Sequence, residues 1–404
     1  MSELNYLEKL LDGTEVEWKA LGDVTSVLRG KRLTKNLLSA EEKFPVFHGG
    51  LEPLGYYNKS NRPANTVMII NVGASAGTVG YSTVDFWSSD GCFCLEHNEL
   101  LNNRFLYFAL IGYQSLLKSK VRVAGIPTLD AIVVNKLLIP IPCPSNPEKS
   151  LAIQSEIVRI LDKFTALTAE LTAELTAELN MRKKQYNYYR DQLLSFDNED
   201  VPHLPMGQKD IGEFIRGGTF QKKDFMDAGV GCIHYGQIYT YYGTYTKKTK
   251  THISAALAKK CKKAQKGNLI IATTSENDED VCKAVAWLGS DDIAVSSDAC
   301  IYKHNLNPKY VSYYFQTEQF QNQKRQYITG AKVRRVNADN LSKILIPVPS
   351  MAVQERIVSI LDKFDTLTNS ITEGLPREIE LRQKQYEYYR DLLFSFPKPE
   401  TASN

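Results

Sequence analysis

The feature that most constrains the fold of this chain is an internal repeat. Residues 151–164 (LAIQSEIVRILDKF) match residues 351–364 (MAVQERIVSILDKF) at nine of fourteen positions, at an offset of 200. Residues 182–196 match residues 382–396 at eleven of fifteen positions, at the same offset. Because such self-similarity identifies a recurring structural unit, the chain is interpreted as two copies of one plan, each a divergent block followed by a similar segment.

Shorter sequence matches extend the repeat into the divergent blocks. LLIPIP at 137–142 returns as ILIPVP at 344–349, so the offset becomes 207 and the first copy holds seven extra residues, 143–149. The remaining matches pair Ser88-Ser89-Asp90-Gly91-Cys92 with Ser296-Ser297-Asp298-Ala299-Cys300, Arg29-Gly30 with Arg216-Gly217, and Gly49 with Gly236. The last pairing makes His48 and Tyr235, which precede these glycines, equivalent.

The similar segments are predicted to be long amphipathic helices. In the first, apolar residues recur three or four positions apart from Ile153 to Leu167, and the pattern resumes near Tyr186. Pro142 and Pro349 precede the two segments and mark boundaries that a helix does not cross backwards. A helix of 46 residues would be roughly 70 Å long.

The middle of the first segment is the tetrapeptide Thr-Ala-Glu-Leu written three times, at 168–179. Its residues favour helix, and Leu171, Leu175 and Leu179 form one slowly winding stripe. We interpret it as a spacer, because each unit adds about 6 Å of length and about 40° of rotation. The second segment has Gly374 and Pro376 in the equivalent stretch, which predicts a kink or a break.

Two such helices in one chain most simply bury their apolar stripes against each other. We expect antiparallel packing, with the divergent blocks at opposite ends and related by a pseudo-twofold axis. The alternative is that each helix lies only on its own domain.

The divergent blocks are predicted to be mixed, which gives an α+β fold class. Strand-like runs such as 67–70 and 269–271 alternate with glycine-rich and asparagine-rich turns, and 103–117 and 308–323 have helical patterns.

These blocks also carry basic, amide and aromatic residues suited to duplex DNA, since Lys and Arg neutralise phosphates and Arg, Gln, Asn and Tyr address base edges. The candidate DNA-binding residues are Arg29, Lys31, Arg32, His48, Tyr56, Tyr57, Lys59, Arg122, Arg216, Tyr235, Gln237, Tyr241, Tyr242, Lys247, Lys248, Lys250, Lys332, Arg334 and Arg335. Two alternatives stay open: the lysine runs are solvated faces, and the aromatic residues are core residues beside tight turns.

Composition excludes several classes of protein. With 43% hydrophobic and 24% charged residues the chain is an ordinary folded protein, and its net charge of +3 creates no global basic field. Seven cysteines without a CxxC pair argue against a disulfide framework and a zinc ribbon, and Cys92 and Cys94 are expected to be buried thiols. The first residues lack the apolar core of a signal peptide, so a cytoplasmic location is expected.

The sequence lacks the common catalytic motifs. The sequence contains no GxxxxGK[ST], no HExxH, no GxSxG and no tetrapeptide of the adenine-methyltransferase type. The glycine-rich stretch 73–80 fits a turn between strands better than a phosphate loop. Catalysis by this chain, and a metal site in it, are therefore not expected.

Taken together, the paired motifs resemble the DNA-specificity subunit of Type I restriction-modification systems. The shared signatures are an I-P-x-P step, a Q-x-x-I-V-x-I-L-D-K-F helix start and a Y-x-Y-Y-R-D helix end, each present twice. The tandem Thr-Ala-Glu-Leu units resemble the IC subfamily. The resemblance implies a non-catalytic subunit whose two target-recognition domains each read half of a bipartite, interrupted DNA sequence.

The resemblance also implies the partners. Two methyltransferase subunits that use S-adenosylmethionine, and restriction (translocase-nuclease) subunits that use ATP and Mg, would bind alongside, with no cofactor on this chain. The residues implied in spacer packing and subunit docking are Gln154, Ile157, Ile160, Leu161, Phe164, Leu171, Leu175, Leu179, Tyr186, Tyr189, Gln354, Ile357, Ile360, Leu361, Phe364, Tyr386 and Tyr389.

The expected domain organisation follows from these boundaries. It comprises an N-terminal helical segment (1–14), recognition domain 1 (15–143), the central spacer helix (144–200), recognition domain 2 (201–349), the C-terminal spacer helix (350–396) and a tail (397–404). Two other functions remain open: a coiled-coil adaptor that joins two protein-binding modules without touching DNA, and a modification enzyme with an unrecognised catalytic motif.

Overall fold

The computed structural model describes residues 4–196, 200–370 and 372–398. The start of the expected N-terminal segment and most of the expected tail lie outside the described residues. The chain divides into two compact units, of which unit 1 is Met1–Ala173 with Glu380–Asn404 and unit 2 is Glu174–Ile379. Each unit thus contains one divergent block and parts of both helical segments.

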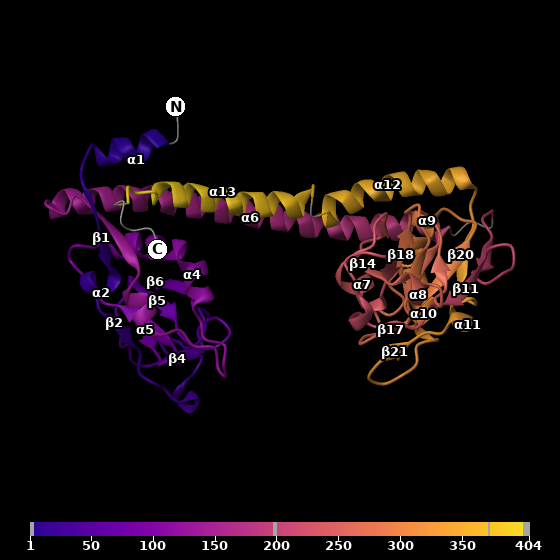
Figure 1. Ribbon diagram of the computed structural model, residues 1–404, viewed down its shortest axis with the longest axis horizontal. Coiled ribbons are helices and arrows are strands. Elements are labelled where there is room, and N and C mark those ends of the chain that lie inside the picture. The colour runs from indigo at the N-terminus through magenta and orange to yellow at the C-terminus, as the bar shows by residue number, and fades with distance from the viewer. Residues whose placement is uncertain (1–3, 197–199, 371, 399–404) are drawn as a thin grey trace. The chain divides into compact units, whose positions relative to one another are not determined.

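Unit 1 contains three small sheets flanked by helices (Figure 1). The sheets have the strand orders β2-β8-β5-β6, β4-β3-β7 and β1-β9. Its strands are β1 (Val16–Ala20), β2 (Val27–Arg29), β3 (Phe44–Phe47), β4 (Gly55–Tyr57), β5 (Thr66–Ile70), β6 (Val79–Ser82), β7 (Trp87–Ser88), β8 (Cys92–Leu95) and β9 (Leu138–Pro142). Its helices are α1 (Leu4–Leu11), α2 (Leu21–Val24), η1 (Lys35–Leu37), α3 (Asn103–Gly112), α4 (Gln114–Ser119) and α5 (Ala131–Asn135).

Unit 2 repeats this plan with larger sheets, β11-β20-β16-β18-β13 and β14-β12-β19-β15, and the pairs β17-β21 and β10-β22. Its strands are β10 (His203–Pro205), β11 (Gly212–Arg216), β12 (Val230–Ile233), β13 (Tyr245–Thr246), β14 (Thr251–Ile253), β15 (Lys263–Ala264), β16 (Leu269–Ala272), β17 (Thr274–Ser275), β18 (Ala284–Trp287), β19 (Ile293–Val295), β20 (Ala299–His304), β21 (Arg334–Arg335) and β22 (Leu345–Pro347). Its helices are η2 (Lys222–Asp224), α7 (Tyr235–Thr240), α8 (Ala255–Ala258), α9 (Pro308–Tyr314), α10 (Glu318–Arg325), α11 (Ala338–Leu341) and α12 (Met351–Asn369). Both blocks are therefore mixed α and β, as predicted.

Strand pairing corrects two of the predicted equivalences. Arg29 pairs with Phe93 and Arg216 pairs with Cys300, so β8 and β20 align at an offset of 207, not the 208 implied by matching the two Ser-Ser-Asp sequences. In the parallel pairs, Phe47 lies opposite Ser88 and Ile233 opposite Val295, so the residue that follows Phe47 corresponds to His234. The prediction that Tyr235 is the counterpart of His48 is therefore wrong.

The Arg-Gly step is conserved between the copies for a steric reason. A Cβ at Gly30 would collide with the backbone carbonyl of Ser89, and a Cβ at Gly217 would collide with that of Ser296. Only glycine lets the strand end pass this close to the neighbouring turn. The prediction that these two dipeptides are equivalent agrees with the strand register.

The helical segments follow the sequence pattern closely. α6 (Pro147–Ser195) is one unbroken helix that includes all three Thr-Ala-Glu-Leu units. The second segment is divided into α12 and α13 (Leu375–Leu393). The predicted break is confirmed there: Gly374 adopts a φ of +84°, which a residue with a side chain rarely adopts.

Within each unit, the beginning of one helical segment packs against the end of the other. In unit 1, Phe164 of α6 stacks on Tyr389 of α13 with ring centroids 5.4 Å apart, and the Tyr386 hydroxyl accepts a hydrogen bond from Thr165. In unit 2, Tyr189 of α6 stacks on Phe364 of α12 at 5.8 Å. In unit 1, later residues of α6 meet earlier residues of α13, which is the order that antiparallel helices have.

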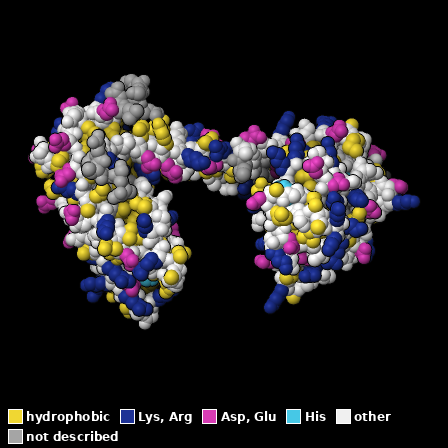
Figure 2. All heavy atoms as spheres, viewed as in Figure 1, with side chains coloured by type: hydrophobic (Ala, Val, Ile, Leu, Met, Phe, Trp, Pro, Cys, Tyr) yellow, Lys and Arg dark blue, Asp and Glu magenta, His cyan; other side chains and the backbone are white. Residues whose placement is uncertain are grey.

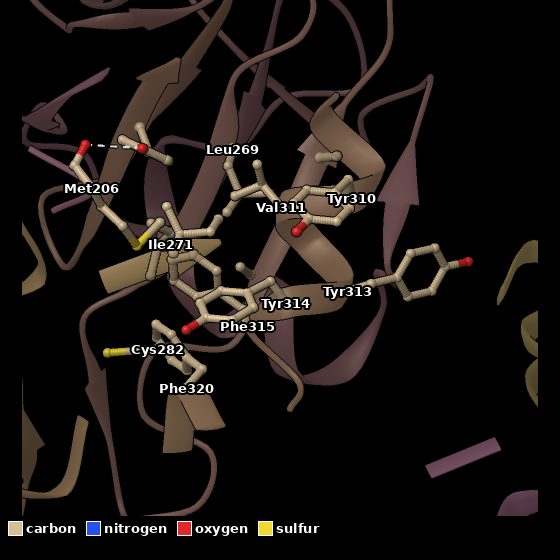
Figure 3. Close-up of a cluster of buried hydrophobic side chains, with 14 of the residues drawn as sticks. Met206, Leu269, Ile271, Cys282, Tyr310, Val311, Tyr313, Tyr314, Phe315 and Phe320 are labelled. Carbon is tan, nitrogen blue, oxygen red and sulfur yellow. Dashed lines mark hydrogen bonds between the residues drawn. The ribbon is translucent and has the colours of Figure 1, made fainter. Parts of the chain in front are cut away.

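The main core of unit 2 is unusually rich in tyrosine (Figure 3). Tyr310, Tyr313 and Tyr314 are buried on α9, and each hydroxyl is satisfied: Tyr310 donates to the Pro347 carbonyl at 3.0 Å and Tyr314 to the Leu345 carbonyl at 2.6 Å. Tyr313 points away from the others and donates to Asp362 of α12 at 2.7 Å. A buried tyrosine needs such partners, so this core also attaches the domain to its helix.

Candidate nucleic-acid interface

In unit 1 the ends of β2, β3 and β8 bring Arg29 and His48 to the same turn. The Arg29 Nε donates to the carbonyl of Asp90 at 3.0 Å, and the His48 Nδ1 lies 3.3 Å from the Asp90 carboxylate. Both side chains are exposed. The backbone N–H of Asn71 donates to the carbonyl of Gly91, the residue after Asp90, at 3.1 Å. Asn71 is 3% exposed, and its side-chain amide oxygen is buried without a hydrogen-bond partner among the described residues.

The other unit 1 candidates lie on neighbouring loops. Lys31, Arg32 and Lys59 are exposed. The rings of Tyr57 and Trp87 meet edge to face with centroids 5.3 Å apart, and the Trp87 Nε1 donates to the Lys31 carbonyl at 2.9 Å. Aromatic packing therefore positions the loop that carries these cations.

Two further candidates complete this set. Tyr56 is exposed, whereas Arg122 forms an ion pair with Asp130 at 3.0 Å. Because both partners of that pair are well exposed, it costs little to exchange for a phosphate contact. In Figure 2, Lys and Arg side chains gather at the end of unit 1 that lies away from α6.

In unit 2 the pair β17-β21 brings Arg335 close to Arg216. Both line a cavity of about 280 Å³, together with Thr329, Asp298 and Asn337. The Arg216 Nε donates to the Ser297 carbonyl at 3.1 Å, as Arg29 does to its own turn. Neither arginine forms an ion pair within the described residues, so both guanidinium groups remain available to an anion or a base edge.

Arg334 and Lys332 precede Arg335 in the chain by one and three residues and do not line this cavity. Arg334 is held by Asp278, with Nε 2.7 Å from the carboxylate, and donates to the Gly330 carbonyl. Lys332 is exposed. The loop that carries Asp278 is in turn held by Lys324, whose buried ammonium donates to the carbonyls of Glu279 and Val281 at 3.0 and 2.8 Å.

The aromatic and lysine-rich stretch of unit 2 divides into exposed and interior residues. Lys247, Lys248, Lys250 and Tyr241 are exposed, and the Lys250 Nζ lies 4.5 Å from the centre of the Tyr241 ring. Such a cation over an aromatic face is a common element of nucleic-acid surfaces. These four residues fit the predicted role.

Gln237 and Tyr242 do not fit it. Gln237 is 8% exposed and uses its amide internally: Oε1 accepts from the backbone N–H of His234, and Nε2 donates to Thr251. Tyr242 is 5% exposed, and its hydroxyl accepts from the Lys250 backbone N–H. Their prediction as DNA-reading residues is corrected, because both polar groups are already satisfied inside the domain. Tyr235 is half-buried, with its ring 4.6 Å from that of His234.

Seven of the seventeen helical candidates are interior to their own unit. Gln154, Ile157 and Leu161, and their repeats Gln354, Ile357 and Leu361, are buried against the adjoining divergent block. They therefore offer no surface to another subunit. Tyr186 is also buried, and its hydroxyl donates to Gln316 at 3.0 Å.

The remaining helical candidates are wholly or partly accessible. Tyr189 is exposed, and the others are half-buried: Ile160, Phe164, Leu171, Leu175, Leu179, Ile360, Phe364, Tyr386 and Tyr389. In unit 1, Ile160, Phe164 and Tyr389 line an apolar cavity of about 350 Å³ with Leu7 of α1.

The described part of the chain is not suited to two other kinds of site. It contains no group of three or more His, Cys, Asp and Glu side chains that could hold a metal ion. None of the helices found there is both long and apolar enough to cross a membrane. All seven cysteines are free and buried, as predicted for Cys92 and Cys94, and burial raises the pKa of Cys92 to about 12.

Comparison with known proteins places this architecture. The family described as "Type I restriction modification DNA specificity domain" matches residues 14–181 and 205–381. The chain is 41% identical over 419 residues to a Type I restriction enzyme specificity subunit of Escherichia coli, and 100% of each chain is covered. The chain belongs to this family. It is a specificity subunit of the Type I restriction-modification class, a non-catalytic component with two DNA-recognition domains.

Two further comparisons agree. The specificity subunit is 34% identical over 415 residues to a putative type I restriction enzyme specificity subunit of Haemophilus influenzae, covering 97% of this chain and 98% of the relative. A chain solved in work on complex assembly and conformational transition of the type I R-M system superposes with a TM-score of 0.62 at 15% identity, covering 94% of this chain and 97% of that one. This second likeness concerns the fold alone.

Reasoning from sequence missed three structural features of the candidate interface and of its attachment to the helices. The counterpart of His48 is His234, not Tyr235, and the strand register shows this. Burial and nearby Lys222 lower the pKa of His234, which caps α7. The unsatisfied Asn71 oxygen and the buried roles of Gln154 and Gln354 had no sequence signal, because each depends on segments far apart in the chain.

Proposed function

We propose that this specificity subunit reads a bipartite, interrupted DNA target, one half with each recognition domain. The observation that carries the proposal is the duplication itself: two domains of one plan are each joined to the same kind of helix. The residues that follow the shared Arg-Gly step differ, being Lys31-Arg32 in unit 1 and Gly218-Thr219 in unit 2, and His48 is exposed whereas its counterpart His234 is buried. The Arg29–His48 turn of unit 1 corresponds to the Arg216–His234 turn of unit 2. One scaffold with two sets of surface residues is suited to two different half-sites.

Phosphate contacts would supply most of the affinity. Exposed cations on the loops of both domains, including Lys31 and Arg32 in unit 1 and Lys247 and Lys248 in unit 2, have no ion-pair partner among the described residues. They can release counterions from duplex DNA. The Arg216–Arg335 cavity, about 280 Å³, is the strongest candidate in unit 2 for contact with a base edge.

The helical segments form, in this proposal, an antiparallel coiled-coil spacer with pseudo-twofold symmetry, of the IC subfamily type. The unbroken course of α6 through the three Thr-Ala-Glu-Leu units supports a rigid spacer. Its half-buried leucines, Leu171, Leu175 and Leu179, are suited to pairing with the second segment. The spacer length then sets the number of base pairs between the half-sites.

Two methyltransferase subunits would dock on the accessible side of these helices and methylate adenine. The apolar cavity bounded by Ile160, Phe164 and Tyr389 supports a docking role in unit 1. Restriction subunits with translocase and nuclease activity would join to cut unmodified DNA. S-adenosylmethionine would be held by the methyltransferase subunits, and ATP and Mg by the restriction subunits, with no cofactor on this chain. The complex would act in the cytoplasm.

The deciding experiment is to map the adenines methylated in genomic DNA by the assembled complex of this subunit with its methyltransferase subunits. We expect one motif with two short specified halves separated by a gap of fixed length. Methylation at a single uninterrupted motif would refute the two-half-site proposal. If the purified complex does not bind duplex DNA, or binds it independently of salt concentration, the results would favour an adaptor that joins proteins instead.

A further inference from the structure

In unit 1, two of the polar contacts that join the recognition domain to α6 are made by Gln154 and Asp162. The buried side chain of Gln154 accepts a hydrogen bond from the backbone N–H of Asn102 at 2.9 Å and donates to the Leu100 carbonyl at 3.2 Å. Two turns further along α6, Asp162 accepts from Arg104, with 2.8 Å between Nη2 and Oδ1. Asn102 caps α3, so both contacts hold the start of that helix.

The bond accepted by the glutamine and the ion pair of the aspartate recur in unit 2, whereas the glutamine there donates to a residue just before its own helix. The buried side chain of Gln354 accepts from the backbone N–H of Asn307 at 2.8 Å and donates to the Pro349 carbonyl at 2.9 Å. Asp362 lies 2.6 Å from the Lys309 Nζ. Asn307 caps α9, the counterpart of α3.

The cation of each contact is also fixed on its domain side. The Arg104 guanidinium lies 4.8 Å from the centre of the Tyr81 ring and 4.9 Å from that of Tyr107. The Lys309 Nζ lies 3.7 Å from the centre of the Tyr245 ring. The helix-side residues, glutamine and aspartate, are the same in both copies, whereas the cation and its aromatic partners differ. The retained element is the attachment, not the surrounding packing.

Two contacts along one helix define an angle. Residues eight apart in a helix are separated by about 12 Å along its axis. Play of about 1 Å at one contact therefore allows a rotation of about 5°, and across a domain of this size, roughly 35 Å, that rotation displaces the far side by about 3 Å. The rise of one base pair is about 3.4 Å. In Figure 1, β17 and β21 lie on the side of unit 2 away from α12, so the displacement acts on candidate reading residues.

We propose that Gln154 with Asp162, and Gln354 with Asp362, are positioning residues that hold each recognition domain at a fixed angle on its helix and so make the complex selective for gap length. The inference rests on the proposed bipartite function. In this inference the spacer helices set the preferred number of base pairs between the half-sites. The four positioning residues determine how strongly the complex rejects a gap that is one base pair longer or shorter.

The test measures methylation by the assembled complex on duplexes whose two half-sites are separated by the native gap, one base pair fewer or one more. The first variant combines Asp162→Ala with Asp362→Ala. We expect the rate ratio between native and altered gaps to fall at least tenfold, equal to about 1.4 kcal/mol, while base preference within each half-site is unchanged. A purely structural role would lower all rates together and leave this ratio intact.

Two control variants and a second test variant make the result specific. Arg159→Ala removes the ion pair that Arg159 makes with Glu156, 2.6 Å apart within α6 and outside the Thr-Ala-Glu-Leu units, and should leave the ratio unchanged. Arg104→Lys should preserve it, because the second copy uses lysine at the equivalent position. Lys309→Met removes one charge while keeping the side-chain length, and should lower the ratio even if the double variant folds poorly.

The outcomes separate the two proposals. If the wild-type complex shows a sharp gap preference that the Asp162→Ala/Asp362→Ala and Lys309→Met variants both retain, the positioning role is refuted and the bipartite function stands. If the wild-type complex has no gap preference, the bipartite function itself fails, and the inference fails with it.

Discussion

Replacing Lys247, Lys248 and Lys250 with alanine should weaken duplex binding at every sequence and flatten its dependence on salt. All three lysines are exposed, and none forms an ion pair within the described residues. The Lys250 Nζ is held 4.5 Å from the centre of the Tyr241 ring, so its position is partly ordered before DNA arrives. Side chains placed this way can each neutralise one phosphate.

The magnitude follows from counterion release. Each phosphate contact contributes about 0.9 to the slope of log K against log salt, so three contacts contribute about 2.7. Between 50 and 200 mM salt, a fourfold change, this slope corresponds to about a 40-fold change in affinity. The wild-type complex should therefore lose about 40-fold more affinity over this range than the triple variant.

The assay is fluorescence anisotropy of a labelled duplex titrated with the complex of this chain and its methyltransferase subunits. The matched control replaces Lys163, Lys183 and Lys184, three exposed lysines of α6, with alanine, and should leave the slope unchanged. An unchanged slope in the Lys247, Lys248 and Lys250 variant would refute phosphate contact there. An equal decrease of the salt slope in the control variant would show that the effect depends only on the net charge of the chain.

Three further outcomes are expected. Deleting residues 176–179 removes about 6 Å and about 40° of helix, which should shorten the preferred gap, by about one base pair in twist, without changing either half-site; a changed half-site base would contradict the spacer role. Burial lowers the pKa of His304 to about 4, while the unfolded value is about 6.5. As the pH drops, the unfolded chain therefore binds a proton before the folded chain does, so the free energy of unfolding falls between pH 6.5 and pH 4, by about 2 kcal/mol at pH 5. Urea unfolding at pH 7 and pH 5 should show this loss of stability in the wild type and not in His304→Phe. The same pH dependence in both proteins would exclude the effect. Because all seven thiols are buried and the pKa of Cys282 is raised to about 12 by burial, iodoacetamide at pH 8 should label the folded chain far more slowly than the chain in urea; rapid labelling of any native thiol would show that its burial is wrong.

The helices were predictable because their determinants are local. Apolar spacing and the Thr-Ala-Glu-Leu units predicted α6, and Gly374 marked the break before α13, since helix propensity and glycine backbone freedom act within a few residues. The α+β class of the divergent blocks followed from short strand runs and turns. The cation-rich loops were recognisable because long charged side chains are seldom buried.

The errors arose where pairing between distant strands decides the outcome. Aligning the two Ser-Ser-Asp sequences gave a register that differs by one residue from the observed register of β8 and β20. Three identical residues can be aligned by chance, whereas the hydrogen bonds between paired strands fix the register. The same kind of slip made Tyr235, not His234, the counterpart of His48. Gln237 and Tyr242 were taken for reading residues because burial of a polar side chain depends on partners brought from elsewhere in the chain.

The amino-acid sequence by itself determined that this chain is built twice from one plan, that its shared parts are helices and that its family is that of the Type I specificity subunits, since repeats, periodicity and motifs are written along the chain. Only the tertiary structure decided which of the polar residues face outward and that Gln154, Asp162, Gln354 and Asp362 attach domain to helix. Those contacts depend on distances between residues that are 52 to 58 positions apart in the first copy and 47 to 53 in the second, and such distances exist only once the chain has folded.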